Sequence, residues 1–72
     1  MREEYHMRTK YYVIPENIAK ELGLTPYRRH NENMEYLVNS GDLVVYGIEK
    51  AVDEGATELT VEEAKTFIKK AT

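Results

Sequence analysis

The residues of this 72-residue chain that are best suited to binding are its tyrosines and one basic cluster. There are six tyrosines against one phenylalanine and no tryptophan. A tyrosine ring joins a large apolar surface to a polar hydroxyl, and an arginine guanidinium offers a planar fork of donors to carboxylates and phosphates. We therefore take as candidate partner-binding residues four tyrosines on expected strands and two neighbouring arginines: Tyr11, Tyr12, Tyr36, Tyr46, Arg28 and Arg29.

These tyrosines have three alternative uses: packing in the core, anchoring a protein partner, and stacking the bases of a single strand. Stacking platforms normally lie in a basic groove, whereas this region adds Glu35 and Asp42. The composition therefore favours packing and a protein interface over nucleic-acid stacking. Acidic neighbours also weaken the field of the arginine cluster, and a solvated loop is the alternative interpretation there.

Catalytic and metal-binding patterns are missing from the sequence. It has no cysteine, and its one serine, Ser40, stands beside a glycine in an expected turn. The two histidines, His6 and His30, are not at ligand spacing with other metal-binding residues, and no glycine-rich phosphate loop is present. We expect no enzymatic activity, no metal and no cofactor. The lack of cysteine also fits a reducing cytoplasm.

Residues 15–33 partly match a helix-turn-helix, which gives a second functional hypothesis: DNA binding and transcription regulation. Ile18, Ala19, Leu22 and Gly23 match the first helix and its turn. The second helix should bury apolar side chains six and nine residues after the glycine, where Arg29 and Glu32 stand, and burying an unpaired charge costs several kcal/mol. The hypothesis therefore requires residues 26–33 to be helical.

A third hypothesis concerns the acidic second half of the chain. Residues 1–30 carry six Lys or Arg against four Glu, a net charge of +2, whereas residues 31–72 carry four Lys against nine Asp or Glu, a net charge of −5. Five acidic side chains within fourteen residues suit a mimic of nucleic acid, although a solvated helix face explains them equally well: Glu49, Asp53, Glu54, Glu58 and Glu62.

The patterns that position these residues predict one small α+β domain at 9–72, after a flexible tail at 1–8. β-branched and aromatic runs predict strands at 9–14, 34–38 and 43–46. Apolar spacing and end signals predict helices at 15–23, 47–54 and 61–70. We expect the strands 34–38 and 43–46 to form a hairpin. A helix beginning at Ser40 is the alternative, which the poor helix propensity of Val44, Val45 and Gly47 disfavours.

Local signals define two of the helices closely. Pro15 suits a first helical position, and Gly23 suits the residue just after a helix, with Leu24 folding back on Ile18. Thr60 with Glu63 forms a capping box for the last helix. Its expected buried stripe is Val61, Ala64, Phe67, Ile68 and Ala71, and that of the helix at 47–54 is Ile48, Ala51 and Val52.

No apolar run approaches the roughly 20 residues that cross a bilayer, and the first residues lack the apolar stretch of a secretory signal. We expect a cytoplasmic protein with no membrane association. A three-stranded sheet leaves edges exposed, and a chain this short has a thin core. The leading hypothesis is therefore a small, non-catalytic interaction protein that binds a protein partner, or a second copy as a homodimer, through a tyrosine-bearing sheet face or edge.

Overall fold

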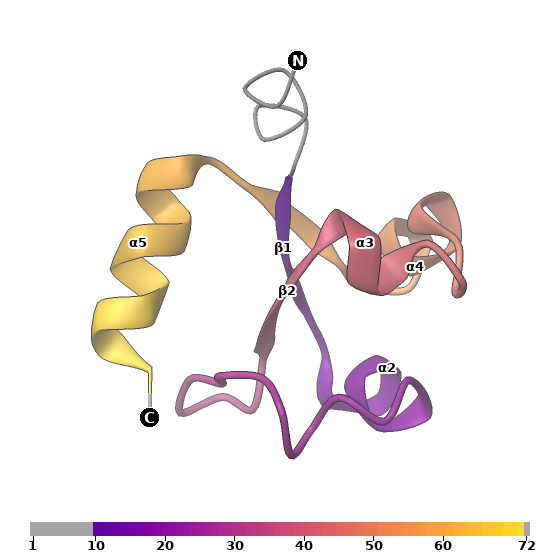
Figure 1. Ribbon diagram of the computed structural model, residues 1–72, viewed down its shortest axis with the longest axis horizontal. Helices are drawn as coiled ribbons and strands as arrows, with labels where there is room; N and C mark the ends of the chain where they lie inside the picture. Colours follow the sequence, from indigo (N-terminus) through magenta and orange to yellow (C-terminus); the bar gives the residue numbers. More distant parts are fainter. Residues whose placement is uncertain (1–9, 72) are drawn as a thin grey trace.

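A three-stranded antiparallel sheet with the strand order β2-β1-β3 forms the centre of the fold. The computed structural model describes residues 10–71, so the expected tail at 1–8 lies outside the described residues. The strands are β1 (Tyr11–Ile14), β2 (Tyr36–Asn39) and β3 (Thr57–Leu59). Helices α2 (Glu16–Glu21), α3 (Ser40–Leu43) and α4 (Ile48–Asp53) lie on one side, and α5 (Val61–Lys70) lies on the other (Figure 1). The predicted α+β class is confirmed.

The core lies between the sheet and α2–α4. Successive side chains of a strand point to opposite faces, and in β1 Tyr12 and Ile14 are buried while Tyr11 and Val13 are half-buried. The register opposes Tyr12 to Val38 and Ile14 to Tyr36. The first face of the sheet therefore carries these four side chains, and the cluster around them includes Ile18, Ala19, Leu43, Ala51 and Ala56.

Helix α2 follows its sequence signals. Pro15 precedes it in an extended conformation, and its carbonyl accepts from the amides of Ile18 and Ala19. The helix ends at Gly23, whose φ of 72° lies in the left-handed region that glycine adopts without strain. The Gly23 amide donates to the Lys20 carbonyl and the Leu24 amide to the Ala19 carbonyl, which is the Schellman arrangement. Leu24 then packs against the core, as predicted.

The predicted strand at 43–46 and its hairpin with 34–38 are wrong. Residues 40–43 form the short helix α3, residues 44–46 form turns, and β2 pairs with β1 instead. The Asn39 side chain accepts from the Asp42 amide at 2.9 Å, and the Asp42 carboxylate accepts from the Asn39 amide at 3.1 Å. This capping box satisfies the free amides at the start of a helix, so it outweighs the strand propensity of the valines that follow.

The third strand is β3, where no strand was expected. It follows α4, which ends at Gly55 as predicted, and it pairs antiparallel with β1. Its sequence, TEL, has exposed first and second residues and a half-buried third. Such a segment lacks the alternation of a half-buried strand, so only its pairing with β1 identifies it. The expected inward position of Val52 on α4 is also wrong, because that side chain is 47% exposed.

Helix α5 covers the second face of the sheet. The capping box of Thr60 and Glu63 forms as predicted, with bonds of 2.8 and 3.0 Å. Its predicted buried stripe is only partly buried, however. Ala64 is buried and Phe67 is half-buried, whereas Val61 and Ile68 are 58% and 44% exposed. One helix therefore lies over a sheet face that it does not fully cover.

Candidate functional site

The structure separates the six predicted binding residues into three groups. Tyr12 and Tyr36 belong to the core, with only 4% and 3% exposure, so neither ring is presented at the surface of the folded chain. Tyr46 packs against the same core from the turn before α4. The remaining three, Tyr11, Arg28 and Arg29, line one hollow on the other side of the sheet.

Tyr46 is engaged within the chain. Its hydroxyl donates a hydrogen bond to the Glu54 carboxylate, and Lys50 Nζ lies 4.5 Å from the centre of its ring. The hydrogen bond and the neighbouring carboxylate raise the pKa of Tyr46 to about 12. These contacts tie Tyr46 to the last turn of α4 and to the residue that follows the helix, so its ring and hydroxyl are both engaged within the chain.

The hollow that contains Tyr11, here called the Tyr11 hollow, has a volume of about 250 Å³. It lies beside the edge strand β2, and α5, the start of α3 and the loop before β2 all contribute to its lining. Its lining residues combine apolar and charged groups: Tyr11, Tyr27, Arg28, Arg29, Leu37, Val38, Asn39, Asp42 and Ile68. Tyr27 and Ile68 are large apolar side chains with 73% and 44% exposure. The hollow therefore offers an apolar contact surface beside two arginines.

Arg28, which lines this hollow, connects two segments of the chain through side-chain hydrogen bonds. Its Nε and Nη2 donate to the two carboxylate oxygens of Asp42 at 3.0 and 2.8 Å, and its Nη1 donates to the Tyr27 carbonyl at 3.2 Å. The two hydrogen bonds from Arg28 lower the pKa of the Asp42 carboxyl, although its partial burial opposes the shift. The pair joins the turn at 24–28 to the start of α3, so the backbone that carries Tyr27 is fixed from one side.

Arg29 differs from its neighbour. Its side chain is exposed and forms no hydrogen bond or ion pair with any residue between 10 and 71. Its backbone carbonyl accepts from the Leu37 amide at 3.0 Å, and the next residue, His30, bridges Tyr36. Residues 29 and 30 therefore cover the outer edge of β2, and the guanidinium of Arg29 remains at the rim of the Tyr11 hollow.

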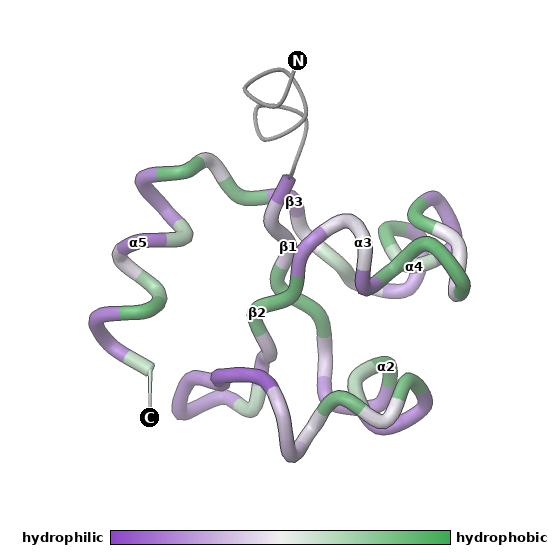
Figure 2. Tube along the Cα trace, viewed as in Figure 1, coloured by the Kyte–Doolittle hydropathy of each residue, from purple (hydrophilic) through white to green (hydrophobic). Residues whose placement is uncertain are grey.

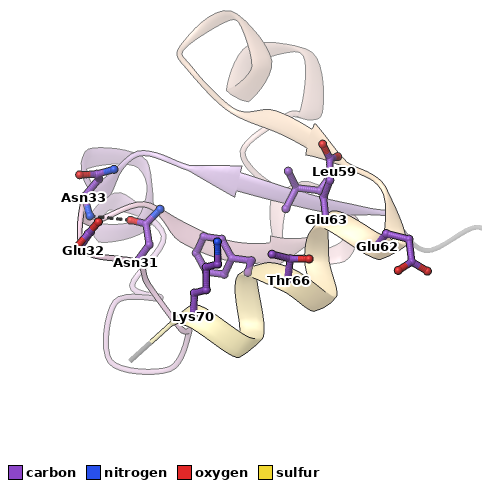
Figure 3. A pocket seen from close by; sticks show the side chains of 9 residues that line it. Asn31, Glu32, Asn33, Leu59, Glu62, Glu63, Thr66 and Lys70 are labelled. Atoms are coloured by element: carbon purple, nitrogen blue, oxygen red, sulfur yellow. Dashed lines mark hydrogen bonds between the residues drawn. The ribbon is translucent and has the colours of Figure 1, made fainter.

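A second, larger hollow, here called the α5 groove, lies along the other side of α5. It has a volume of about 720 Å³, within the range of ligand pockets. Its lining comes from the loop before β2, the end of β3 and α5: Asn31, Glu32, Asn33, Leu59, Glu62, Glu63, Thr66, Phe67 and Lys70. Figure 3 shows Asn31 and Glu32 at one end of the groove, Leu59 and Glu62 at the other, and Thr66 between them.

The two hollows lie on opposite sides of α5. At about 100° per residue, Ile68, which lines the Tyr11 hollow, lies roughly 140° around the helix from Glu63, which lines the α5 groove. Ala64 faces the sheet between them. The exposed part of the apolar stripe of α5, Val61 and Ile68, thus belongs to the side of the Tyr11 hollow.

Asn31 shapes the polar end of the α5 groove. Its Oδ1 accepts from the amides of Asn33 and Glu35, both at 2.9 Å, and its Nδ2 donates to Glu35 Oε1 at 2.8 Å. Met34 is in the left-handed region with a φ of 59°. These bonds close the loop at 31–35, which appears in Figure 2 as a largely hydrophilic stretch before β2.

The helix-turn-helix prediction lacks its second helix. Residues 25–33 contain no helix: they form turns, a bend and the isolated bridge of His30 with Tyr36, and the amides of Tyr27 and Arg28 both donate to the Leu24 carbonyl. Arg29 and Glu32 are exposed, so they do not occupy buried positions. The likeness therefore ends at Gly23.

Most residues of these hollows were not among the predicted binding residues, including the large side chains Tyr27, Ile68 and Phe67. The tyrosine lay in a stretch without periodicity, and the two residues of α5 were assigned to a buried stripe. Among residues 10–71, no three or more histidine, aspartate or glutamate side chains gather as a metal would require. Within the same range, no helix combines the length and the apolar character that crossing a bilayer demands.

Comparisons of the chain with protein-family models, with curated proteins and with solved structures gave no match. The two hollows beside α5 and the residues that line them are therefore the features that bear on function.

Proposed function

We propose that this chain is a small, non-catalytic interaction protein that binds a protein partner through the Tyr11 hollow. The observation that carries the proposal is that part of the apolar stripe of α5 is not covered by any other described element of the chain. Ile68 of its apolar stripe is 44% exposed and lines the hollow together with the 73% exposed ring of Tyr27, and Val61 of the same stripe is 58% exposed. Exposed apolar groups with a polar rim are typical of protein interaction sites, and tyrosine and arginine are enriched at interface hot spots.

The charges around the hollow define the chemistry of its partner. Arg28 is neutralised by Asp42, but Arg29 has no counter-ion among the described residues. A segment that places an apolar side chain against Ile68 and Tyr11, and a carboxylate near Arg29, would complement both features. As in the sequence hypothesis, the binding surface includes a tyrosine of the sheet, but this tyrosine is Tyr11 and not the buried Tyr12 or Tyr36. We also propose that the protein is cytoplasmic.

The test is affinity capture from an extract of the native host with three forms of the full chain. They are the wild type, Ile68→Asp, which places a charge in the hollow, and Val45→Asp, which makes the same kind of change at a side chain 93% exposed in the turn before α4. Circular dichroism and thermal melts first establish that all three are folded. Each extract is divided into untreated and nuclease-treated halves.

We expect a partner protein that the wild type and Val45→Asp retain, that Ile68→Asp loses, and that survives nuclease. Proteins that bind all three forms alike would contradict the proposed site. Partners that disappear with nuclease would contradict the proposed class of partner and would favour nucleic-acid binding.

A further inference from the structure

We propose that the α5 groove receives the turn around Tyr27 from a second copy of this chain, in a head-to-tail contact. The inference does not depend on the identity of the proposed partner, although the residues that enter the groove, Tyr27 and Arg29, also line the Tyr11 hollow. The turn consists of Pro26, Tyr27, Arg28 and Arg29 and is called the tip below. Three properties of the molecule support this contact: the charge of the groove, the chemistry of the tip and the rigidity of the tip.

The groove combines apolar surface with an acidic side chain at each end. Leu59 and Phe67 supply the apolar surface. Glu32 stands at one end and Glu62 at the other (Figure 3), and neither carboxylate has a hydrogen bond or ion pair with the described residues. The Glu63 carboxylate is already engaged by the Thr60 amide. With Lys70 as the one lysine in the lining, the groove is best complemented by an apolar group that carries a positive charge.

The tip has this combination of groups. Tyr27 presents an aromatic ring that is 73% exposed, and the exposed guanidinium of Arg29 follows two residues later. Because the groove has a free carboxylate at each end, a ring seated over Phe67 brings Arg29 toward Glu32 or toward Glu62 in either direction of entry. The imbalance between a front half of +2 and a back half of −5 agrees with such a contact between unlike surfaces.

The tip is also held in position before any contact forms. Arg28 bonds both oxygens of Asp42 and the carbonyl of Tyr27, and the amides of Tyr27 and Arg28 both donate to the Leu24 carbonyl at 2.8 and 3.0 Å. A group that is already ordered loses less conformational entropy on binding. Tyr27 is thus an exposed aromatic side chain on a fixed turn, which is the form that interface anchors take.

The tip and the groove of one copy lie on different sides of α5, so the contact joins different surfaces of two copies. Such contacts form rings when the rotation closes and open chains when it does not. We therefore expect the full chain to associate with increasing concentration, and the association to weaken with salt because a charge pair takes part.

Sedimentation velocity on two variants tests the contact. The tip variant, Tyr27→Ala with Arg29→Glu, removes the anchor and reverses its charge, and both side chains are exposed. The groove variant, Thr66→Arg, fills the groove from an exposed position on α5. Asp53→Arg on α4 is the matched control, because it places the same residue at an exposed position on the other side of the sheet.

We expect each variant alone to weaken association by about 30-fold or more, as loss of a hot-spot aromatic does, and Asp53→Arg to associate like the wild type. A mixture of the tip variant and the groove variant should form a one-to-one dimer and nothing larger, since only one intact tip and one intact groove can meet. A wild-type chain that stays monomeric at every concentration would overturn the inference. So would association that survives in either variant, or a mixture that stays monomeric.

These outcomes are separate from those of the proposed function. Ile68→Asp leaves the tip and the groove intact, so it should associate like the wild type even where it loses the partner. Thr66→Arg leaves the Tyr11 hollow intact, so it should retain the partner even where it no longer associates. Ile68→Asp and Thr66→Arg therefore separate the two proposals, whereas the tip variant changes residues that both proposals use.

Discussion

Replacing Asp42 with alanine should lower the free energy of unfolding by about 2 kcal/mol at neutral pH. The Asp42 carboxylate accepts two bonds from Arg28, at 3.0 and 2.8 Å, and one from the Asn39 amide at 3.1 Å. The backbone bond contributes about 1 kcal/mol. The paired bonds to arginine would contribute more if they were buried, but the Arg28 side chain is 35% exposed, and screening by solvent reduces them to about 1 kcal/mol as well.

A loss of this size is readily measured in a domain of 72 residues. Each kcal/mol shifts the melting temperature of a small domain by about 4–8 °C, so Asp42→Ala should melt roughly 10 °C below the wild type in a thermal scan followed by circular dichroism. Arg28→Ala should account for about half of the loss. The double variant should be little worse than Asp42→Ala, because both substitutions break the same pair.

The pH dependence follows from the direction of the pKa shift. Arg28 holds the pKa of Asp42 below its ordinary value in the folded chain. Folding therefore gains stability from this group above the unfolded pKa of about 3.9, and loses it as the pH falls through the folded value. The gap between the wild type and Asp42→Ala should be complete at pH 7 and should shrink below about pH 4.

Asp53→Ala is the control, because Asp53 is exposed on α4 and forms no ion pair with the described residues. Its effect should stay within about 0.5 kcal/mol. Equal stabilities of the wild type and Asp42→Ala at pH 7 would refute the stabilising role assigned to the Arg28–Asp42 pair. A gap of the same size at both ends of the pH range would refute the ionic part of the argument, since a protonated carboxyl no longer pairs with Arg28.

Two further predictions concern the tyrosines. Tyr12→Ala should lower the free energy of unfolding in urea by about 3 kcal/mol or more, because Tyr12 is 4% exposed in the core, whereas Tyr11→Ala should cost about 1 kcal/mol; equal losses would contradict the assigned faces of β1. The pKa of Tyr46 should lie near 12, measured from the ring carbon resonances of labelled tyrosine and assigned with Tyr46→Phe. Because this folded pKa exceeds the ordinary value of 10, the stability from the bond to Glu54 should be complete below about pH 10 and lost as the pH approaches 12. Titration of Tyr46 near pH 10 would contradict the hydrogen bond.

The features that the sequence predicted well depend on neighbours in the chain. Gly23 ends α2, Thr60 and Glu63 begin α5, and Gly55 ends α4, and each of these signals acts within a few residues. The alternation in β1 also predicted that Tyr11 and Tyr12 point to opposite faces. It did not predict which face would be fully covered, because that depends on where α2, α4 and α5 pack.

The features that it predicted wrongly depend on residues far apart. Val44 and Val45 favour a strand, but the segment before them is helical. The capping box of Asn39 and Asp42 begins this helix, and Arg28, 14 residues before Asp42 in the chain, donates a hydrogen bond to the Asp42 carboxylate. Strand β3 exists because β1 offers it a second edge. Val61 and Ile68 fit the apolar stripe of α5, yet a stripe predicts burial only where another element covers it.

Arg28 and Arg29 show how this bears on the candidate site. In the sequence they are adjacent arginines in one polar loop, so they form a single basic cluster and the sequence does not distinguish their roles. In the folded chain Arg28 bonds Asp42 and the Tyr27 carbonyl, whereas Arg29 has an exposed guanidinium and contributes its backbone to the edge of β2. A bidentate pair needs its carboxylate at a fixed distance and angle, and the capping box of α3 provides this. The free charge of Arg29 and the fixed ring of Tyr27 are thus consequences of how α3 begins, and both binding proposals depend on that start.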